Sequence, residues 1–240
     1  MPETEAASLT TPLLGGSRQT SQDPLYKNLW RDYALLAQAG VLIVVAVVWR
    51  GVFTHNVILF SGHPLLQSLG LLVVTQAILI LQPTHEPEQK RVGQRAHAAL
   101  NLTSFLLFTS GVTIIEVNKF RGHGPHFHSV HGTLGILTSI AILLQYFVGF
   151  TIWAVPSLYG GVDNAKALYK YHRVSGYIIY LALLATVLSA VWTDYNVNVL
   201  GIAWWQLVVP IALVLPLLLR INAAKFGFRQ SRAPGLQDDQ

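Results

Sequence analysis

The chain has 240 residues, of which 52% are hydrophobic and only 11% are charged, and it contains no cysteine. A water-soluble domain has about 25% charged residues, so this composition favours a membrane protein, and the lack of cysteine excludes disulfides, thiolate nucleophiles and cysteine-bound iron–sulfur clusters. The net charge of +5 comes from cations that lie between apolar segments, which fits membrane orientation better than nucleic-acid binding.

Six windows without Asp, Glu, Lys or Arg follow one another along the chain. They are residues 33–49, 51–84, 96–115, 122–162, 174–193 and 195–219. A spanning helix needs about 20 largely apolar residues, and Gly, Pro and His interrupt the starts of the two long windows, so each window holds one helix. The sequence therefore predicts an all-α membrane protein with six transmembrane helices.

The segments outside these windows predict the domain limits and the orientation. Residues 1–28 and 223–240 are polar and predict disordered tails, with the membrane domain at residues 29–222. Of the 16 Lys and Arg residues, 13 fall on the side of the N-terminus, and the other three are Arg50, Lys119 and Arg121. The positive-inside rule then places both tails in the cytoplasm.

Four of the nine histidines fall near the starts of successive predicted helices, namely His63, His97, His131 and His172. Because successive helices run in opposite directions, we expect His63 and His131 near the non-cytoplasmic face, and the other two near the cytoplasmic face. Ionisable residues inside a membrane are costly and usually functional, and two imidazoles on facing helices can hold a haem iron from both sides. A zinc site gathers three or four ligands in one place, so two histidines at each level favour haem.

Two of these histidines are followed, four residues later, by a glycine: Gly135 after His131 and Gly176 after His172. Residues four apart share a helix face, so each glycine leaves room for a flat group such as a porphyrin. Small residues also allow membrane helices to approach one another closely. Both interpretations remain open at this stage.

The stretches SGHPLLQSLG, GQRAHAALN, SVHGTLGIL and KYHRVSGY resemble the cytochrome b561 family of six-helix transmembrane reductases, in particular its short forms without a sensory domain. The resemblance covers roughly residues 29–220 and implies that the second to fifth helices form a central bundle that binds two b-type haems per chain. It implies that His63 and His131 bind the non-cytoplasmic haem iron, and that His97 and His172 bind the cytoplasmic one.

The resemblance also implies an activity, which is electron transfer from cytoplasmic ascorbate to ferric iron, as a ferric chelate, or to monodehydroascorbate across the membrane. Family members occur in endomembrane, vacuolar or plasma membranes and often form homodimers. The end of the second window reads LLVVTQAILILQPTHEPEQK and lacks the aliphatic–Tyr–Arg stretch of the relatives best tied to ascorbate. The donor therefore stays open between ascorbate, a related reductone and another small reductant.

Cations near the cytoplasmic haem are the predicted donor-binding residues, namely Arg91, Arg95, Lys166 and Lys170. Ascorbate is an anion near neutral pH, so these side chains would attract it, although positive-inside topology also explains them. Arg173 is predicted to pair with a haem propionate.

On the non-cytoplasmic side, His123, His126 and His128 precede His131 and are the candidate acceptor-side residues. Such a run suits iron or copper, and a solvated loop is the alternative interpretation. His126 or His128 could replace His131 as the outer ligand, but only His131 borders the apolar, glycine-bearing helix. This loop also carries the alternative function, a metal-ion transporter that collects its ion at the histidines.

Overall fold

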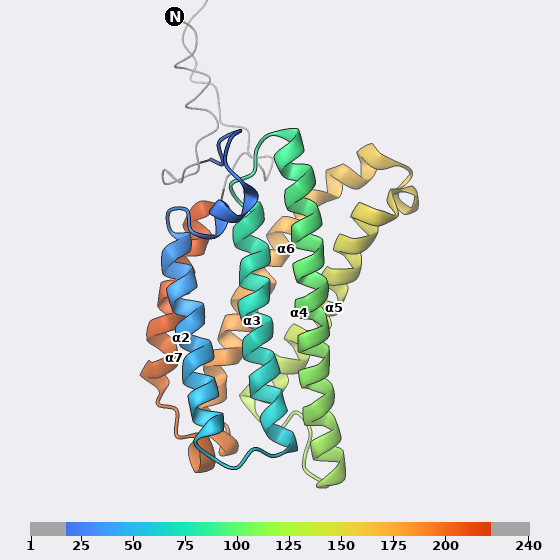
Figure 1. Cartoon of the computed structure of the whole chain (residues 1–240). Helices are drawn as coiled ribbons and strands as arrows, with labels where there is room; N and C mark the ends of the chain where they lie inside the picture. The colour runs from blue at the N-terminus through green and yellow to red at the C-terminus, as the bar shows by residue number, and fades with distance from the viewer. Residues whose placement is uncertain (1–17, 222–240) are drawn as a thin grey trace, which may run out of the picture.

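The protein is described by a computed structural model for residues 18–221, in which all regular structure is helical. Its long helices run up and down side by side (Figure 1) and are α2 (Ala34–Phe53), α3 (Gly62–Leu81), α4 (Pro87–Arg121), α5 (Val130–Ala154), α6 (Val162–Ser189) and α7 (Trp204–Val214). Short helices join or extend them and are η1 (Leu25–Leu29), η2 (Leu59–Ser61), η3 (Pro156–Tyr159), η4 (Ala190–Trp192), η5 (Asn196–Leu200) and η6 (Leu215–Arg220). The predicted all-α class is confirmed.

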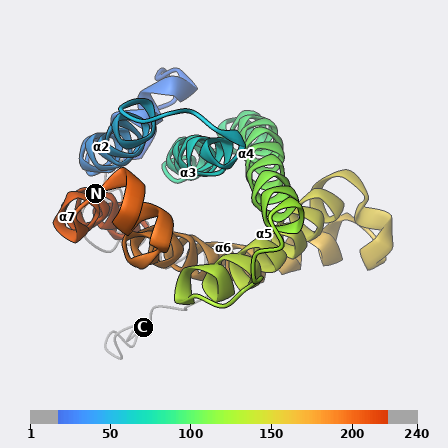
Figure 2. The same ribbon diagram turned by 90° about the horizontal axis from the view of Figure 1, so that it is seen from below.

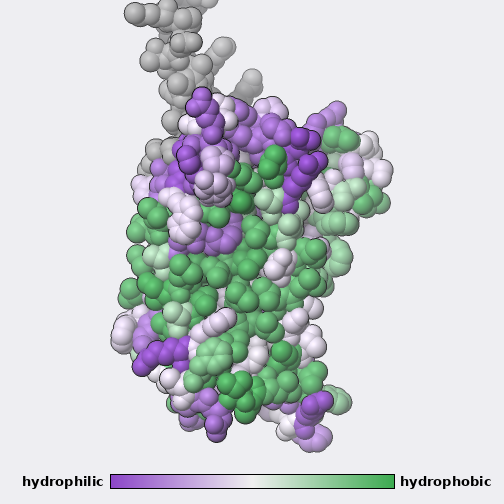
Figure 3. Space-filling view, in the orientation of Figure 1, coloured by the Kyte–Doolittle hydropathy of each residue, from purple (hydrophilic) through white to green (hydrophobic). Residues whose placement is uncertain are grey.

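Most of the helices have the length and composition of membrane spans. Five helical segments are long and apolar enough to cross a bilayer, and they are Ala34–Phe53, Leu59–Leu81, Pro87–Arg121, Val130–Ala154 and Val162–Trp192. Large apolar side chains such as Leu137, Leu144 and Ile178 are exposed on them. Figure 3 shows the resulting apolar band between two polar ends. The chain is therefore a multi-pass membrane protein.

The sixth crossing is shorter and is built from two helix types. Proline has no N–H for the α-helical hydrogen bond, and Pro216 lies at the start of the six-residue 3-10 helix η6, which continues the eleven-residue α7. At rises of 1.5 and 2.0 Å per residue the two together are about 28 Å long, close to the roughly 30 Å hydrocarbon core. Arg220 Nη2 donates to the Asn28 carbonyl at 3.0 Å, so the chain returns to its starting side, as six crossings require.

The helix bounds differ from the predicted windows at charged residues. α2 includes Arg50 in its last turn, because a long cationic side chain can reach the interface from inside a helix. α4 has 35 residues and is about 52 Å long at 1.5 Å per residue, so the predicted window 96–115 is only its membrane part.

The helices associate mainly as three pairs. The most extensive contacts join α3 to α4, α2 to α7 and α5 to α6, and Figure 2 shows α2 and α7 together at one edge of the bundle. Between α2 and α7 the backbones come close, since a Cβ atom on Gly40 would lie 2.4 Å from the Pro210 carbonyl oxygen. Small residues allow this kind of packing in membranes, where burial of apolar surface drives association less than in water.

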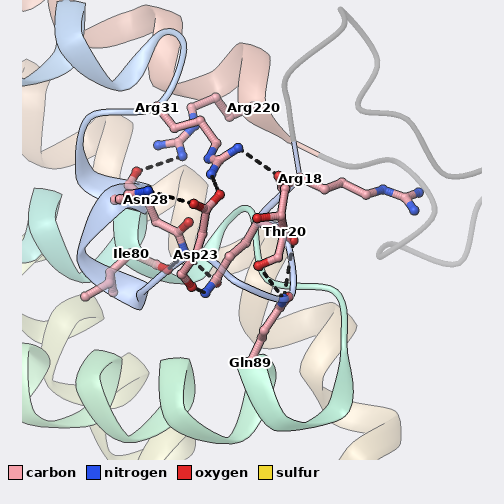
Figure 4. Close-up of polar contacts among 10 residues, drawn as sticks. Arg18, Thr20, Asp23, Asn28, Arg31, Ile80, Gln89 and Arg220 are labelled. Atoms are coloured by element: carbon pink, nitrogen blue, oxygen red, sulfur yellow. Dashed lines mark hydrogen bonds and ion pairs between the residues drawn. The ribbon is translucent and has the colours of Figure 1, made fainter.

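The predicted tail boundary at residue 28 is wrong for residues 18–28, which fold back over the connection between α3 and α4 (Figure 4). Asn28 is fully buried, and its Nδ2 donates to Gln19 Oε1 and to the Ile80 carbonyl, both at 2.9 Å. Polar groups in such a segment hydrogen-bond to helix-end carbonyls that would otherwise be unpaired. The hydropathy of a polar segment does not reveal these contacts. Residues 1–17 and 222–240 lie outside the described residues.

An ionic cluster holds the same segment together. Asp23 accepts hydrogen bonds from Lys27, at 2.9 Å, and from Arg31. Hydrogen bonds from Lys27, Thr20 and Arg31 hold the pKa of the Asp23 carboxyl well below its usual value. Arg31 Nη1 also donates to the Arg18 carbonyl at 2.9 Å, so the cluster ties the beginning of the described chain to the first long helix.

Replacement of the buried amide tests this cap. Asn28→Ala leaves the Gln19 side chain and the Ile80 carbonyl without their donor, and two such losses cost about 2–4 kcal/mol. We expect a lower midpoint of thermal unfolding in detergent, with Tyr26→Ala, at a side chain that is 61% exposed, as the control of smaller effect. Equal midpoints for the two variants would show that the cap does not contribute to stability.

Candidate functional site

His63 near the start of α3 and His131 near the start of α5 face each other at one end of the bundle. Their ring centroids are 6.1 Å apart and the ring planes form an angle of 85°. A bond from a transition metal to an imidazole nitrogen is about 2.0 Å long and the nitrogen lies roughly 1.1 Å from the ring centre, so two imidazoles on one metal have centroids about 6.2 Å apart. The spacing fits one metal atom between these rings.

Each of these two rings is fixed by a backbone carbonyl of the neighbouring helix. His63 Nδ1 donates to the Gly111 carbonyl of α4 at 3.0 Å, and His131 Nδ1 donates to the Thr186 carbonyl of α6 at 2.9 Å. A carbonyl can only accept, so Nδ1 carries the proton and Nε2 keeps its lone pair. Metal-binding histidines are held in this way, which makes Nε2 of both rings available as a ligand.

The second pair, His97 of α4 and His172 of α6, lies at the other end of the bundle. His97 Nδ1 donates to the Ala77 carbonyl of α3 at 2.8 Å. The His172 ring packs against α5, where a Cβ atom on Gly149 would lie 2.6 Å from its Cε1. Gly149 is therefore needed for the position of this imidazole.

A constant spacing relates the histidines to the groups that hold them. Each of the helices α3, α4, α5 and α6 carries one paired histidine. Fourteen residues later on the same helix lies the residue that contacts Nδ1 of the histidine on the neighbouring helix. These pairs are His63 and Ala77, His97 and Gly111, His131 and Gln145, and His172 and Thr186. Fourteen residues make nearly four helical turns, so both members share a face and lie about 21 Å apart along the helix. The same fourteen-residue relation thus recurs at both ends of the bundle.

The surroundings of both levels fit a wide group held by two imidazoles. α3 and α4 lie on one side of the bundle axis and α5 and α6 on the other (Figure 2), and α3 makes few direct contacts with α5, as does α4 with α6. Within residues 18–221, no group of three or more His, Asp or Glu side chains could hold a metal ion. Two ligands per level suit the axial positions of haem iron and do not complete a zinc site.

The two glycines after the histidines have different surroundings. A Cβ atom on Gly135 would meet only Thr186 Cγ2, at 3.9 Å, so space remains beside His131. A Cβ atom on Gly176 would lie 3.0 Å from Gln145 Nε2. Gly176 therefore serves the approach of α6 to α5, whereas Gly135 leaves the room that a flat ligand needs.

Two of the predicted donor-binding cations form ion pairs within their own helices. Arg91 donates through Nε and Nη2 to the Glu88 carboxylate at 2.9 and 2.8 Å, and Lys166 Nζ lies 3.3 Å from Asp163 Oδ1. All four side chains are at least 60% exposed. Exposed pairs are weak and exchange readily, so both cations remain accessible to an anion from solution.

The other three predicted cations differ in exposure. Lys170 is exposed and its Nζ lies 4.8 Å from the ring centre of Tyr171. Arg95 is exposed on α4, two residues before His97. Arg173 directly follows His172, is half-buried and interacts electrostatically with Tyr177. Arg95, Lys170 and Arg173 are thus the predicted cations nearest in sequence to the second histidine pair.

The structure does not bring the candidate acceptor-side histidines together. His126 Nδ1 lies 2.7 Å from the Glu116 carboxylate of α4, and His128 Nδ1 donates to the Pro125 carbonyl at 3.1 Å. His123 has a positive φ of 50° in the turn after α4. Of the histidines in this region, the ring beside His63 is that of His131.

The sequence matches one protein-family model over both levels of the site. The eukaryotic cytochrome b561 model matches residues 62–195, which is more than half of the chain and includes all four paired histidines. The chain belongs to the eukaryotic cytochrome b561 family. Membership implies that it binds haem b, and the paired imidazoles of this cytochrome b561 fit that group.

Similar proteins are reductases named for ascorbate. The lysosomal membrane ascorbate-dependent ferrireductases of Bos taurus and Homo sapiens are 30% identical over 152 residues and 27% identical over 168 residues. A transmembrane ascorbate-dependent reductase of Mus musculus is 26% identical over 165 residues. These alignments cover 60%, 65% and 65% of this cytochrome b561, and 55%, 68% and 64% of the relatives. The chain thus spans about half to two thirds of the relatives it matches.

Sequence reasoning missed the groups that hold the rings, above all Gln145. Its amide Nε2 lies 3.1 Å from His172 Nδ1. The signal that could have found it is its sequence separation of fourteen residues from His131. The same separation from the histidines of α3 and α4 leads to the carbonyls of Ala77 and Gly111, which hold the rings of His97 and His63.

The contact of Gly149 with His172 gives a test of the second level. Gly149→Ala should displace the imidazole, because the added methyl would lie 2.6 Å from the ring, and about half of the bound haem should be lost if each level holds one. Haem per chain and the reduced absorption spectrum measure this. The matched control is Gly51→Ala, whose Cβ meets the flexible end of Ile202 at 3.3 Å. An unchanged spectrum in Gly149→Ala would contradict the assignment.

Proposed function

We propose that this cytochrome b561 transfers electrons across the membrane through two b-type haems per chain. His63 and His131 would be the axial ligands on the non-cytoplasmic side, and His97 and His172 those on the cytoplasmic side. The observation that carries the proposal is the 6.1 Å spacing of His63 and His131. The second pair supports it, because the residues fourteen positions after His63 and His131, Ala77 and Gln145, contact Nδ1 of His97 and His172.

The chain's own groups explain why the proposed reaction is electron transfer. Bound haem b supplies one-electron oxidation and reduction at each level. His63 with His131, and His97 with His172, would hold this group from both sides, which favours electron transfer over oxygen chemistry. The carbonyls of Gly111, Thr186 and Ala77 fix the protonated Nδ1 of three rings, and this keeps the ligand geometry constant between redox states. Levels about 21 Å apart span most of the roughly 30 Å hydrocarbon core.

The proposed direction runs from the cytoplasm outwards. The excess of Lys and Arg on the side of the described N-terminal end supports a cytoplasmic location for that end, and the Arg220–Asn28 contact places the end of η6 on the same side. The exposed cations Arg91, Arg95, Lys166 and Lys170 then lie on the cytoplasmic side, at the starts of α4 and α6. An anionic reductant such as ascorbate fits this field, and Arg173 is placed to meet a haem propionate.

On the opposite face, the proposed acceptor is ferric iron in a chelate or monodehydroascorbate. The names of the ascorbate-dependent relatives support this class of reaction. His123, His126 and His128 stay candidate acceptor-side residues. A location in an endomembrane, vacuolar or plasma membrane and a homodimer also stay predictions.

A metal-ion transporter is not favoured. Such a protein needs a site where several ligands gather, and residues 18–221 contain no group of three or more His, Asp or Glu side chains arranged for a metal ion. The family match and the two equal histidine levels support the redox proposal instead.

Alanine substitutions test the ligand assignment. His63→Ala and His131→Ala should each remove the non-cytoplasmic haem, and His97→Ala and His172→Ala the cytoplasmic one, because haem iron held by two imidazoles loses one of its axial ligands. Each variant should keep roughly half of the haem in the reduced difference spectrum. His55→Ala, in the loop after α2, should keep all of it. A folded but colourless wild-type protein would refute the proposal.

A vesicle assay tests the donor side. With the protein reconstituted, ascorbate on the cytoplasmic face and a ferric chelate on the other, Arg95→Gln should raise the apparent KM for ascorbate about fivefold, since one exposed charge pair contributes about 1 kcal/mol. The control is Arg50→Gln, which removes an exposed cation in the last turn of α2. In the proposed orientation, Arg50 lies on the side of the membrane opposite to Arg95. If Arg50→Gln raises the KM as much as Arg95→Gln does, the proposed orientation is wrong.

A further inference from the structure

The starts of α4 and α6 carry the same pattern of side chains. Residues 88–97 read EQKRVGQRAH and residues 163–172 read DNAKALYKYH. In both, an acid lies nine residues before the final histidine, cations lie six and two residues before it, and a neutral polar side chain lies three residues before it. The acid and the first of these cations form an ion pair on each helix. The two neutral residues, Gln94 and Tyr169, therefore occupy equivalent places before His97 and His172.

Gln94 and Tyr169 meet each other across the bundle. The Gln94 side chain forms a hydrogen bond with the Tyr169 hydroxyl, although α4 and α6 make few direct contacts. Residues three apart share a helix face, and three residues cover about 4.5 Å along a helix. The contact of Gln94 with Tyr169 is therefore about one turn nearer to the helix starts than His97 and His172, on the same faces of the two helices.

The surroundings of this pair suit an anion that carries hydroxyl groups. Gln94 and Tyr169 are half-buried, and cations outnumber acids in both segments. The flanking cations are exposed and are Arg91, Arg95, Lys166 and Lys170. A phenol and a primary amide that share one hydrogen bond still have further donors and acceptors. The pair thus offers hydrogen bonds between cations of both helices, where the field attracts an anion.

We propose that Gln94 and Tyr169 bind the hydroxyl groups of the cytoplasmic electron donor and so select an anionic enediol, the chemical class of ascorbate, over anions that lack hydroxyls. The proposal rests on the proposed function and names the residues that determine its donor. The cations attract any anion, whereas the hydrogen bonds of an amide and a phenol require matching groups at defined distances. A donor without hydroxyls would leave these groups unpaired, which is how a site rejects an analogue.

The test compares two anionic donors on the cytoplasmic face of vesicles that contain the reconstituted protein. Ascorbate has an enediol, whereas dithionite has no hydroxyl group. Tyr169→Phe removes only a hydroxyl and should raise the apparent KM for ascorbate about fivefold, the effect expected for one hydrogen bond. Gln94→Leu should raise the same KM. The rate of haem reduction by dithionite should stay at the wild-type value in both variants, because their cations are intact.

The matched control is Tyr171→Phe, which removes the hydroxyl of a tyrosine that is 63% exposed on the same helix and should leave both donors unaffected. Haem content and the reduced absorption spectrum separate donor binding from support of His172, and both should match the wild type in Tyr169→Phe. An unchanged KM for ascorbate in either variant, an equal loss with dithionite, or loss of haem in Tyr169→Phe overturns the proposal. Failure of ascorbate to reduce the wild-type protein would instead refute the proposed function.

Discussion

Hydrogen bonds between imidazole Nδ1 atoms and carbonyls of neighbouring helices are the interaction on which the arrangement of this cytochrome b561 depends. An imidazole inside a bilayer needs a partner for its N–H, and for three of the rings that partner is a backbone carbonyl of the antiparallel helix alongside. The bond therefore fixes three things together: the register of the two helices, the tautomer of the ring and the direction of Nε2. His63 with Gly111 and His97 with Ala77 lock α3 to α4 at both levels.

The same logic explains how the helices are grouped. α3 with α4 and α5 with α6 form two hairpins, and the two helices of each hairpin contact each other extensively. Each hairpin therefore does not need close contact with the other at the levels of the histidine rings. Between the hairpins, contacts such as Thr75 Oγ1 with Tyr180 OH at 2.7 Å tie α3 to α6 in the buried interior. α2 and α7 pack on each other at one edge, and Asn28, which precedes α2, joins the end of α3 to Arg220 at the end of η6.

The two levels are alike in construction but differ in their surroundings. Next to the His63–His131 level, His126 of the following loop contacts Glu116 of α4, whereas the exposed cations Arg91, Arg95, Lys166 and Lys170 lie on the helices of the His97–His172 level. Beside His172, the side-chain amide of Gln145 stands in the place where the other three rings have a carbonyl.

The sequence by itself determined the six crossings, the orientation bias and the four histidines, because hydropathy, charge and the alternation of helix direction act locally along the chain. It could not place residues 18–28, since a polar segment reads as a tail until the carbonyls that it contacts are known. The pairing of His63 with His131 followed from threading, but their facing rings, the role of Gly149 and the Gln145 contact were decided only by tertiary structure. Side-chain direction and the approach of neighbouring helices depend on packing between distant residues, which no local pattern contains.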